Sequence, residues 1–138
     1  MIKPKVLFLC SRNSCRTQMA EGLLRHLAGD RFEVASAGGE SSALDGEAVL
    51  AMREIGVEIS HQVSKDSERF LGQRFSYVIS LCDRRKETEC PIFPGAIWRL
   101  QWDIGNPANA PSLDDYRVAV RAAREEIRER VLEFVQNH

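Results

Sequence analysis

The segment "CSRNSCRT", residues 10–17, combines a nucleophile with groups that bind anions. Cys10 follows the apolar run "VLFL", and Arg16 comes six residues later, where a helical pattern begins. Backbone N–H groups at a helix start, together with a guanidinium, bind tetrahedral oxyanions. The same positive surroundings favour the thiolate, which is the attacking form of cysteine. We therefore predict a nucleophilic Cys10 in a loop that holds an oxyanion through Ser11, Arg12, Asn13, Ser14, Cys15, Arg16 and Thr17.

Strands and helices alternate along the chain on both sides of this loop. Short apolar runs predict strands at residues 5–10, 32–38 and 75–82, and a weaker one at 96–102. Helical spacing predicts a helix from Arg16 to about Gly29, with Met19, Ala20, Leu23, Leu24 and Leu27 on its apolar face. A second helix is expected within 44–56, and a long terminal helix follows a capping box formed by Ser112 and Asp115.

This alternation predicts an α/β fold with a parallel sheet, and the absence of an internal linker predicts one domain, residues 1–138. In such sheets the ligand lies outside the carboxyl ends of the strands. Cys10 and Cys82 each close an apolar run, so both sulfurs are expected at that edge. Trp98 and Trp102 are expected to pack in the core or a pocket wall.

The composition excludes several classes of function. With a net charge of −1, the chain is not expected to bind nucleic acid or an anionic membrane. It has no signal-peptide pattern and no apolar run of membrane-spanning length, so we expect a cytoplasmic protein. Its four cysteines are then expected to be catalytic or redox-active, and their spacing matches no common zinc pattern, so no metal site is predicted.

The motif C-x5-R-[ST] after an apolar strand resembles the low-molecular-weight protein tyrosine phosphatase family. The adjoining "QMAEG" and the later "ASAG", residues 35–38, resemble the arsenate reductases built on the same fold. The similarity extends from about residue 5 into the terminal helix. It implies a three-layer sandwich around a central four-stranded parallel sheet.

The segment "SLCDRRKETECPI" separates the two activities of this fold. It resembles the redox segment of the thioredoxin-coupled reductases, with Cys82 and Cys90 as the second and third thiols. Seven residues separate these cysteines here, against six in the family. The resemblance implies a relay in which Cys10 attacks arsenate, Cys82 attacks Cys10, and Cys90 attacks Cys82. Thioredoxin, glutaredoxin or a low-molecular-weight thiol would supply the electrons, and no metal or organic cofactor is needed.

The general acid of the phosphatases is missing from its expected place. The family has an Asp directly before a proline, but in "WDIGNPANAP" Asn106 precedes Pro107, and an amide cannot donate a proton as an acid does. Asp103 is the nearest substitute. The loss counts more against a phosphatase than against arsenate reduction, because arsenate carries its own protons. Two alternatives stay open, a tyrosine phosphatase and an anion-binding or redox-sensing module without turnover.

Three further positions resemble residues that hold the anion loop and, in some family members, a potassium ion. They are Asn13, Glu21 and Ser36. Lys65 or Asp66 stands where the family has a fourth, acidic position. Cys15 resembles the second loop cysteine of the phosphatases, and we interpret it as structural or outside the reaction pathway.

Overall fold

The computed structural model of the chain describes residues 2–88 and 90–138. Its strands form one parallel sheet in the order β2-β1-β3-β4. The strands are β1 Lys5–Cys10, β2 Glu33–Gly38, β3 Phe75–Ser80 and β4 Ala96–Gln101. The helices are α1 Arg16–Ala28, α2 Gly46–Arg53 and α3 Leu113–Asn137, with 3-10 turns η1 Ser67–Phe70 and η2 Pro107–Asn109. The predicted α/β class and four-stranded parallel sheet are confirmed.

The strand order reverses at β1. The chain leaves β1 to form β2 on one side, then returns to form β3 on the other side of β1. Cys10 is the last residue of β1 and pairs with Gly38 of β2, while Leu9 pairs with Ser80 of β3. A reversal of this kind leaves a crevice at the carboxyl ends of the strands, and this is where ligands bind in open α/β sheets. The topology therefore puts Cys10 at the crevice.

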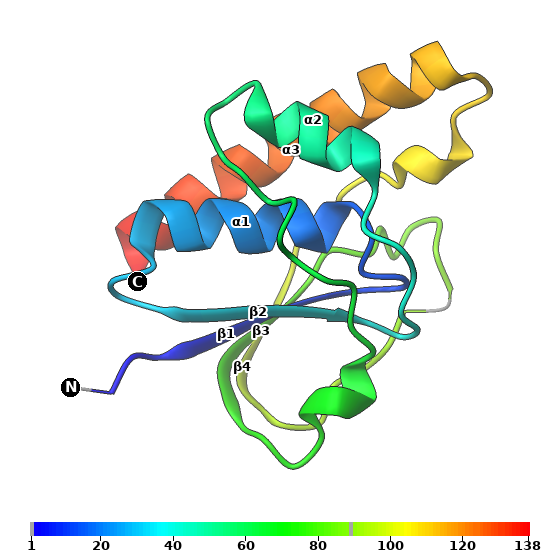
Figure 1. Cartoon of the computed structure of the whole chain (residues 1–138). Coiled ribbons are helices and arrows are strands. Elements are labelled where there is room, and N and C mark those ends of the chain that lie inside the picture. The colour runs from blue at the N-terminus through cyan, green and yellow to red at the C-terminus, as the bar shows by residue number, and fades with distance from the viewer. Residues whose placement is uncertain (1, 89) are drawn as a thin grey trace.

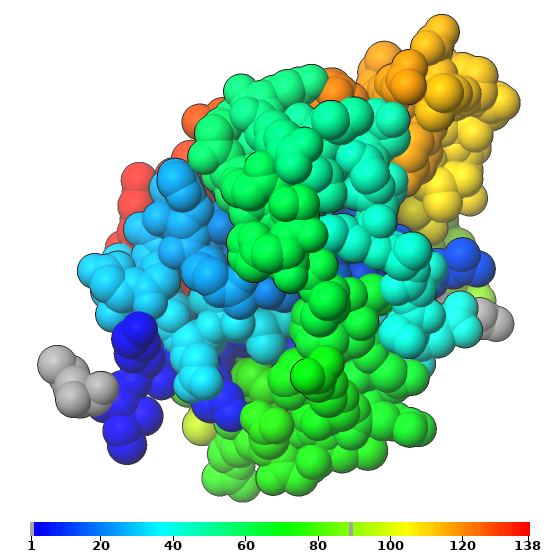
Figure 2. Space-filling model, in the orientation of Figure 1, coloured from blue at the N-terminus to red at the C-terminus, as the bar shows by residue number. Residues whose placement is uncertain are grey.

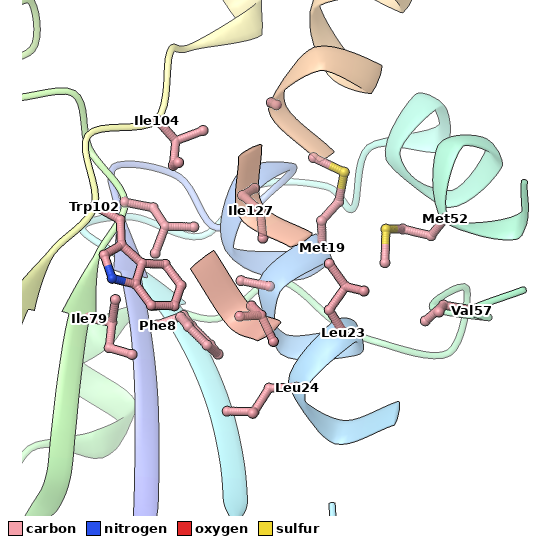
Figure 3. Close-up of a cluster of buried hydrophobic side chains, with 14 of the residues drawn as sticks. Phe8, Met19, Leu23, Leu24, Met52, Val57, Ile79, Trp102, Ile104 and Ile127 are labelled. Atoms are coloured by element: carbon pink, nitrogen blue, oxygen red, sulfur yellow. The ribbon is translucent and has the colours of Figure 1, made fainter. Parts of the chain in front are cut away.

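All three α-helices lie on one face of the sheet (Figure 1). The main hydrophobic core lies between them and the strands, and Figure 3 shows Phe8 of β1 beside Trp102, with Met19 and Leu24 of α1 facing them. The rings of Phe8 and Trp102 are 5.8 Å apart between centroids. Helix α3 buries Val120, Ile127, Val131 and Phe134 in this core. These contacts hold the start of α1 rigidly against the end of β1.

The other face of the sheet is covered by η1 and an irregular segment rather than by long helices. Phe75 of β3 packs edge-to-face against Phe70 of η1 and against Phe93, with centroids 5.8 and 5.6 Å apart. The chain reaches this face along the β2 edge, where Asp66 bridges to Gly38. In Figure 2 this connection, coloured green, covers the front of the molecule from the helices down to η1. The second covering layer is therefore thin.

Three sequence expectations need correction. Strand β3 ends at Ser80, so Cys82 lies two residues beyond the strand rather than at its end. Leu27 of α1 is 42% exposed, because it lies at the end of the helix. Trp98 is 63% exposed because β4 is an edge strand of the sheet, whereas Trp102 is buried as expected. Within the described residues, no helix has both the length and the hydrophobicity needed to cross a membrane.

Candidate active site

A cavity of about 500 Å³ opens at the carboxyl end of β1. Of the predicted anion-binding residues, its wall includes Ser11, Arg12, Ser14, Cys15 and Arg16, together with Cys10. Asn13 and Thr17 are fully buried behind this wall. Helix α1 begins at Arg16, and its N-cap Cys15 makes no side-chain capping bond within the described structure. The first N–H groups of α1 and its dipole are thus available to an anion at this end of the sheet.

The sulfur of Cys10 has two hydrogen-bond neighbours from its own loop. The backbone N–H of Asn13 donates to Cys10 Sγ over 3.1 Å, and Thr17 Oγ1 lies 3.1 Å from the same sulfur. Asn13 Nδ2 donates to Thr17 Oγ1 over 2.8 Å. Because that bond uses a lone pair of the hydroxyl, the Thr17 hydrogen is free to point at the sulfur. Both neighbours are therefore placed to stabilise a negative sulfur.

Asn13 holds the loop in shape with all of its side-chain hydrogen-bonding capacity. Its Nδ2 donates to Thr17 Oγ1 and to Ser36 Oγ, each over 2.8 Å. Its Oδ1 accepts from Gln18 Nε2 over 2.9 Å and from the backbone N–H of Lys65 over 2.8 Å. The backbone of Asn13 is left-handed, with φ of 56°, a conformation that asparagine tolerates better than most residues. The residue thus ties the loop to α1, to β2 and to the chain before η1.

The loop also lies directly against the end of β2. A Cβ atom on Gly38 would come within 2.7 Å of the backbone at Arg12 and Asn13. Only glycine leaves room for that approach. Gly39 then donates its N–H to the carbonyl of Cys10 over 3.1 Å. The glycine that ends "ASAG" is therefore required by the loop that packs on it.

A buried carboxylate and a lysine stand behind the loop. Ser36 Oγ donates to Glu21, whose carboxylate also pairs with Arg25 at 2.8 Å and with Lys65 Nζ at 3.6 Å. Burial lowers the pKa of Lys65, and the charge of Glu21 opposes that effect. A potassium ion at this position would need the negative charge of Glu21, but the ammonium of Lys65 already neutralises that charge. The residues present therefore do not fit a potassium ion. Among the described residues, no group of three His, Cys, Asp or Glu side chains is arranged to hold a metal.

Arg16 is buried and connects the loop to two other segments. Its NH1 group donates to the carbonyls of Leu81 and Ile104, over 3.2 and 3.0 Å. Both NH1 and NH2 donate to the carboxylate of Glu87, over 2.7 and 2.8 Å. Burial lowers the pKa of Arg16, but the bond to Glu87 and the nearby thiols more than offset this, so the pKa stays raised. The guanidinium is charged and fixed in place.

The second and third predicted thiols lie together beside Arg16. Cys82 is fully buried and Cys90 partly buried, and the neighbouring Cys90 contributes to the raised pKa of Cys82. Burial raises the pKa of Cys82 far above its usual value, and the contact with Cys90 and the charges of Cys10 and Glu87 raise it further. Between the two cysteines the chain forms a turn, in which Glu87 N–H donates to the carbonyl of Asp83 over 2.7 Å. Cys82 thus lies close enough to both Cys10 and Cys90 for each of them to raise its pKa.

The two candidate positions for an acid lie in different surroundings. Asn106 is part of the cavity wall. The Asp103 carboxylate does not line that cavity; it accepts from Arg84 N–H over 3.1 Å and from Gln101 Nε2 over 2.9 Å. The structure therefore brings the amide, rather than the nearby carboxylate, to the site.

The sequence analysis missed two residues of this cavity, Asp45 and Tyr116. Asp45 caps α2 by accepting from Glu47 N–H over 2.9 Å, and its carboxylate also accepts from the Tyr116 hydroxyl. Burial raises the pKa of Cys15, and the neighbouring Asp45 carboxylate raises it further, so Cys15 stays a neutral thiol. The N-cap position of Asp45, after the strand that ends at the crevice, is the signal that could have placed it here.

Comparison with known proteins gives consistent matches over nearly the whole chain. The profile of the low molecular weight phosphotyrosine protein phosphatase family matches residues 5–136. The chain is 39% identical over 137 residues to an arsenate reductase of Halalkalibacterium halodurans, covering 99% of this chain and 98% of that protein.

Solved structures with the same fold include two informative neighbours. An arsenate reductase in its phosphate-binding state has a TM-score of 0.79 at 35% identity, over 97% of this chain and 98% of that one. A thioredoxin-dependent arsenate reductase of Corynebacterium glutamicum has a TM-score of 0.71 at 29% identity, over 98% of this chain and 61% of that one.

Proposed function

The chain belongs to the low molecular weight phosphotyrosine protein phosphatase family, and from that premise we propose that it is an arsenate reductase. Its substrate class is a tetrahedral oxyanion, and its electrons come from a thiol reductant. More specifically, we propose arsenate as the substrate and thioredoxin as the reductant, as in the Corynebacterium glutamicum relative.

One observation carries this proposal beyond the fold: Cys82 is buried directly after Leu81, whose carbonyl accepts from Arg16 of the anion loop, and Cys90 lies near enough to raise the pKa of Cys82. A phosphatase needs one thiol and an acid. This site has a second thiol, Cys82, whose pKa is raised by both Cys90 and Cys10, and the amide of Asn106 lines the cavity in place of an acid. Thiols without an acid suit electron transfer rather than hydrolysis of a phosphate ester.

In the proposed first step, the Cys10 thiolate attacks arsenic(V), and a water or hydroxide leaves. Asn13 N–H and Thr17 stabilise the sulfur before attack, at the distances of 3.1 Å described above. Arg16 and the N–H groups at the start of α1 hold the oxyanion's negative charge. The product is a Cys10–arsenate adduct.

The next steps move two electrons from sulfur to arsenic. Cys82 loses its proton as it attacks the sulfur of Cys10, the S–As bond breaks, and its electron pair leaves with arsenic as arsenite, which takes up the proton. Two thiols are thereby oxidised to a Cys10–Cys82 disulfide while arsenic(V) becomes arsenic(III). Cys90 then attacks Cys82, which frees Cys10 and leaves a Cys82–Cys90 disulfide for the external dithiol. Because the cycle starts from free thiols, a reducing compartment such as the cytoplasm suits it.

The decisive experiment measures arsenate-dependent NADPH consumption by the purified protein. We expect turnover with thioredoxin and thioredoxin reductase, and much less with glutathione and glutaredoxin. Turnover only with the glutathione system would contradict the proposed reductant. Rapid hydrolysis of nitrophenyl phosphate without arsenate reduction would contradict the proposed reaction itself.

A further inference from the structure

Glu87 makes a contact that the proposed relay does not use. Its two carboxylate oxygens accept from NH1 and NH2 of Arg16, and Oε2 also accepts from Asp83 N–H over 2.6 Å. The Arg16 and Glu87 side chains are only 4% and 14% exposed. Such a paired, two-point contact fixes both the position and the plane of a guanidinium. Glu87 lies in the chain between Cys82 and Cys90, so the loop that carries these thiols also anchors Arg16.

Three of the hydrogens on the Arg16 guanidinium are engaged, and the two on NH1 are shared among three acceptors. A guanidinium has five N–H groups. NH1 serves the two carbonyls and Glu87, and one NH2 hydrogen serves Glu87. Within the described part of the chain, Nε–H and the second NH2 hydrogen make no hydrogen bond. These two lie parallel on one edge of the group, and such an edge matches two oxygens of a tetrahedral anion.

Glu87 itself lies outside the oxyanion cavity. Arg16 lines the cavity that contains Cys10, whereas Glu87 lines a neighbouring one of about 510 Å³. Ser11 and Arg12 form the wall that the two cavities share. Glu87 therefore holds the guanidinium from behind and does not occupy the place of the anion.

We propose that Glu87 is a positioning residue that turns the free edge of Arg16 toward the oxyanion. Glu87 has two opposing effects on anion binding. Its negative charge repels the anion, whereas its hydrogen bonds to Arg16 orient the guanidinium that binds the anion. The compact, nearly buried pair makes orientation the larger effect, since a displacement of about 1 Å at a reacting site costs about a hundredfold in rate. If the repulsion were the larger effect, removing the charge of Glu87 would strengthen phosphate binding instead of weakening it.

The test compares inorganic phosphate binding, by titration calorimetry, in wild type and Glu87→Gln. This inference rests on the proposed oxyanion site, but phosphate binding needs no redox step. We expect Glu87→Gln to weaken phosphate binding about tenfold, and to lower kcat/KM for arsenate by about ten- to a hundredfold through both kcat and KM. Glu87→Asp, which keeps the charge, should restore part of both. Glu58→Gln, which breaks an exposed pair with Arg53, should change neither.

The outcomes separate this inference from the proposed function. Unchanged or tighter phosphate binding in Glu87→Gln overturns the inference, whatever the arsenate activity. A wild type that binds phosphate but reduces no arsenate overturns the proposed function, while the phosphate comparison still decides the role of Glu87. Should Glu87→Gln fail to fold, Glu87→Ala decides instead, because phosphate affinity equal to wild type in that variant overturns the inference.

Discussion

The backbone N–H of Asn13 donates to the sulfur of Cys10 over 3.1 Å, at a residue whose φ is 56°. This contact puts a hydrogen-bond donor on the nucleophile before any substrate arrives. A hydroxyl in place of the thiol would be scarcely ionised at neutral pH, so the donor alone cannot activate it. Replacing the sulfur of residue 10 by oxygen should therefore abolish turnover but leave anion binding largely unchanged.

Cys10→Ser should abolish arsenate reduction and leave phosphate binding within about threefold of wild type, because the loop N–H groups and Arg16 are unchanged. Calorimetry and the NADPH assay measure the two properties separately. Cys15→Ser is the matched control in the same loop and should retain most of the activity. Reduction of arsenate by Cys10→Ser would refute the assignment of the nucleophile.

Removing each relay thiol should stop the cycle at a different stage. Cys90→Ser should complete one turnover and accumulate a Cys10–Cys82 disulfide, whereas Cys82→Ser should stop thioredoxin-driven cycling. Mass mapping of disulfides after one equivalent of arsenate measures this. The relay is wrong if only Cys10–Cys15 bridges form.

Restoring an acid at the cavity wall should recover phosphatase chemistry. General acid catalysis contributes about 10² to 10⁴-fold, and Asn106 lines the cavity, so Asn106→Asp should raise nitrophenyl phosphate hydrolysis within that range. Arsenate reduction should change much less. Asp103→Asn is the control, and it should leave both reactions nearly unchanged because Asp103 is engaged by Arg84 and Gln101. A large loss in Asp103→Asn would instead make Asp103 the acid.

The lysine beside Glu21 should make the enzyme insensitive to potassium. Wild type should turn over equally fast in potassium and choline salts, because Lys65 already compensates the buried carboxylate. Breaking a buried ion pair completely costs about 3 to 5 kcal/mol of unfolding free energy. Lys65→Met should lose less than this, because Arg25 still contacts Glu21. Its activity should fall and should recover in potassium. Lys3→Met, at an exposed lysine, should behave as wild type in both salts.

The ion pairs between α2 and α3 should contribute a small, pH-dependent stability. Hydrogen bonds from Arg121 and Arg124 hold the pKa of Glu54 at about 2, against an ordinary 4.5. Because the folded pKa is the lower one, the contribution is complete above about 4.5 and is lost as the pH falls toward about 2. Glu54→Gln should therefore be less stable than wild type at neutral pH, and the difference should shrink through that range.

Urea unfolding at several pH values measures this difference. Glu133→Gln, at an exposed carboxylate on α3, is the control and should show no such convergence with wild type. A Glu54→Gln difference that stays constant down to pH 2 would show that the carboxylate charge is not the cause.

The sequence by itself determined the fold class and predicted the chemistry of the anion loop, because both depend on local patterns. Alternating apolar runs and helical stripes predict the parallel sheet, and a cysteine, an arginine and small residues at a strand-to-helix turn predict an oxyanion site. These features need only neighbours along the chain.

The tertiary structure alone decided which distant side chains meet at the crevice. Lys65 reaches Glu21 because the chain before η1 runs beside β2, and Glu87 reaches Arg16 because a turn folds the segment after β3 back over the loop. Asp103 and Asn106 lie three residues apart in the sequence, yet only Asn106 lines the cavity. Spacing cannot show such pairings, because they depend on how separate segments pack and on where each side chain points after the strands end.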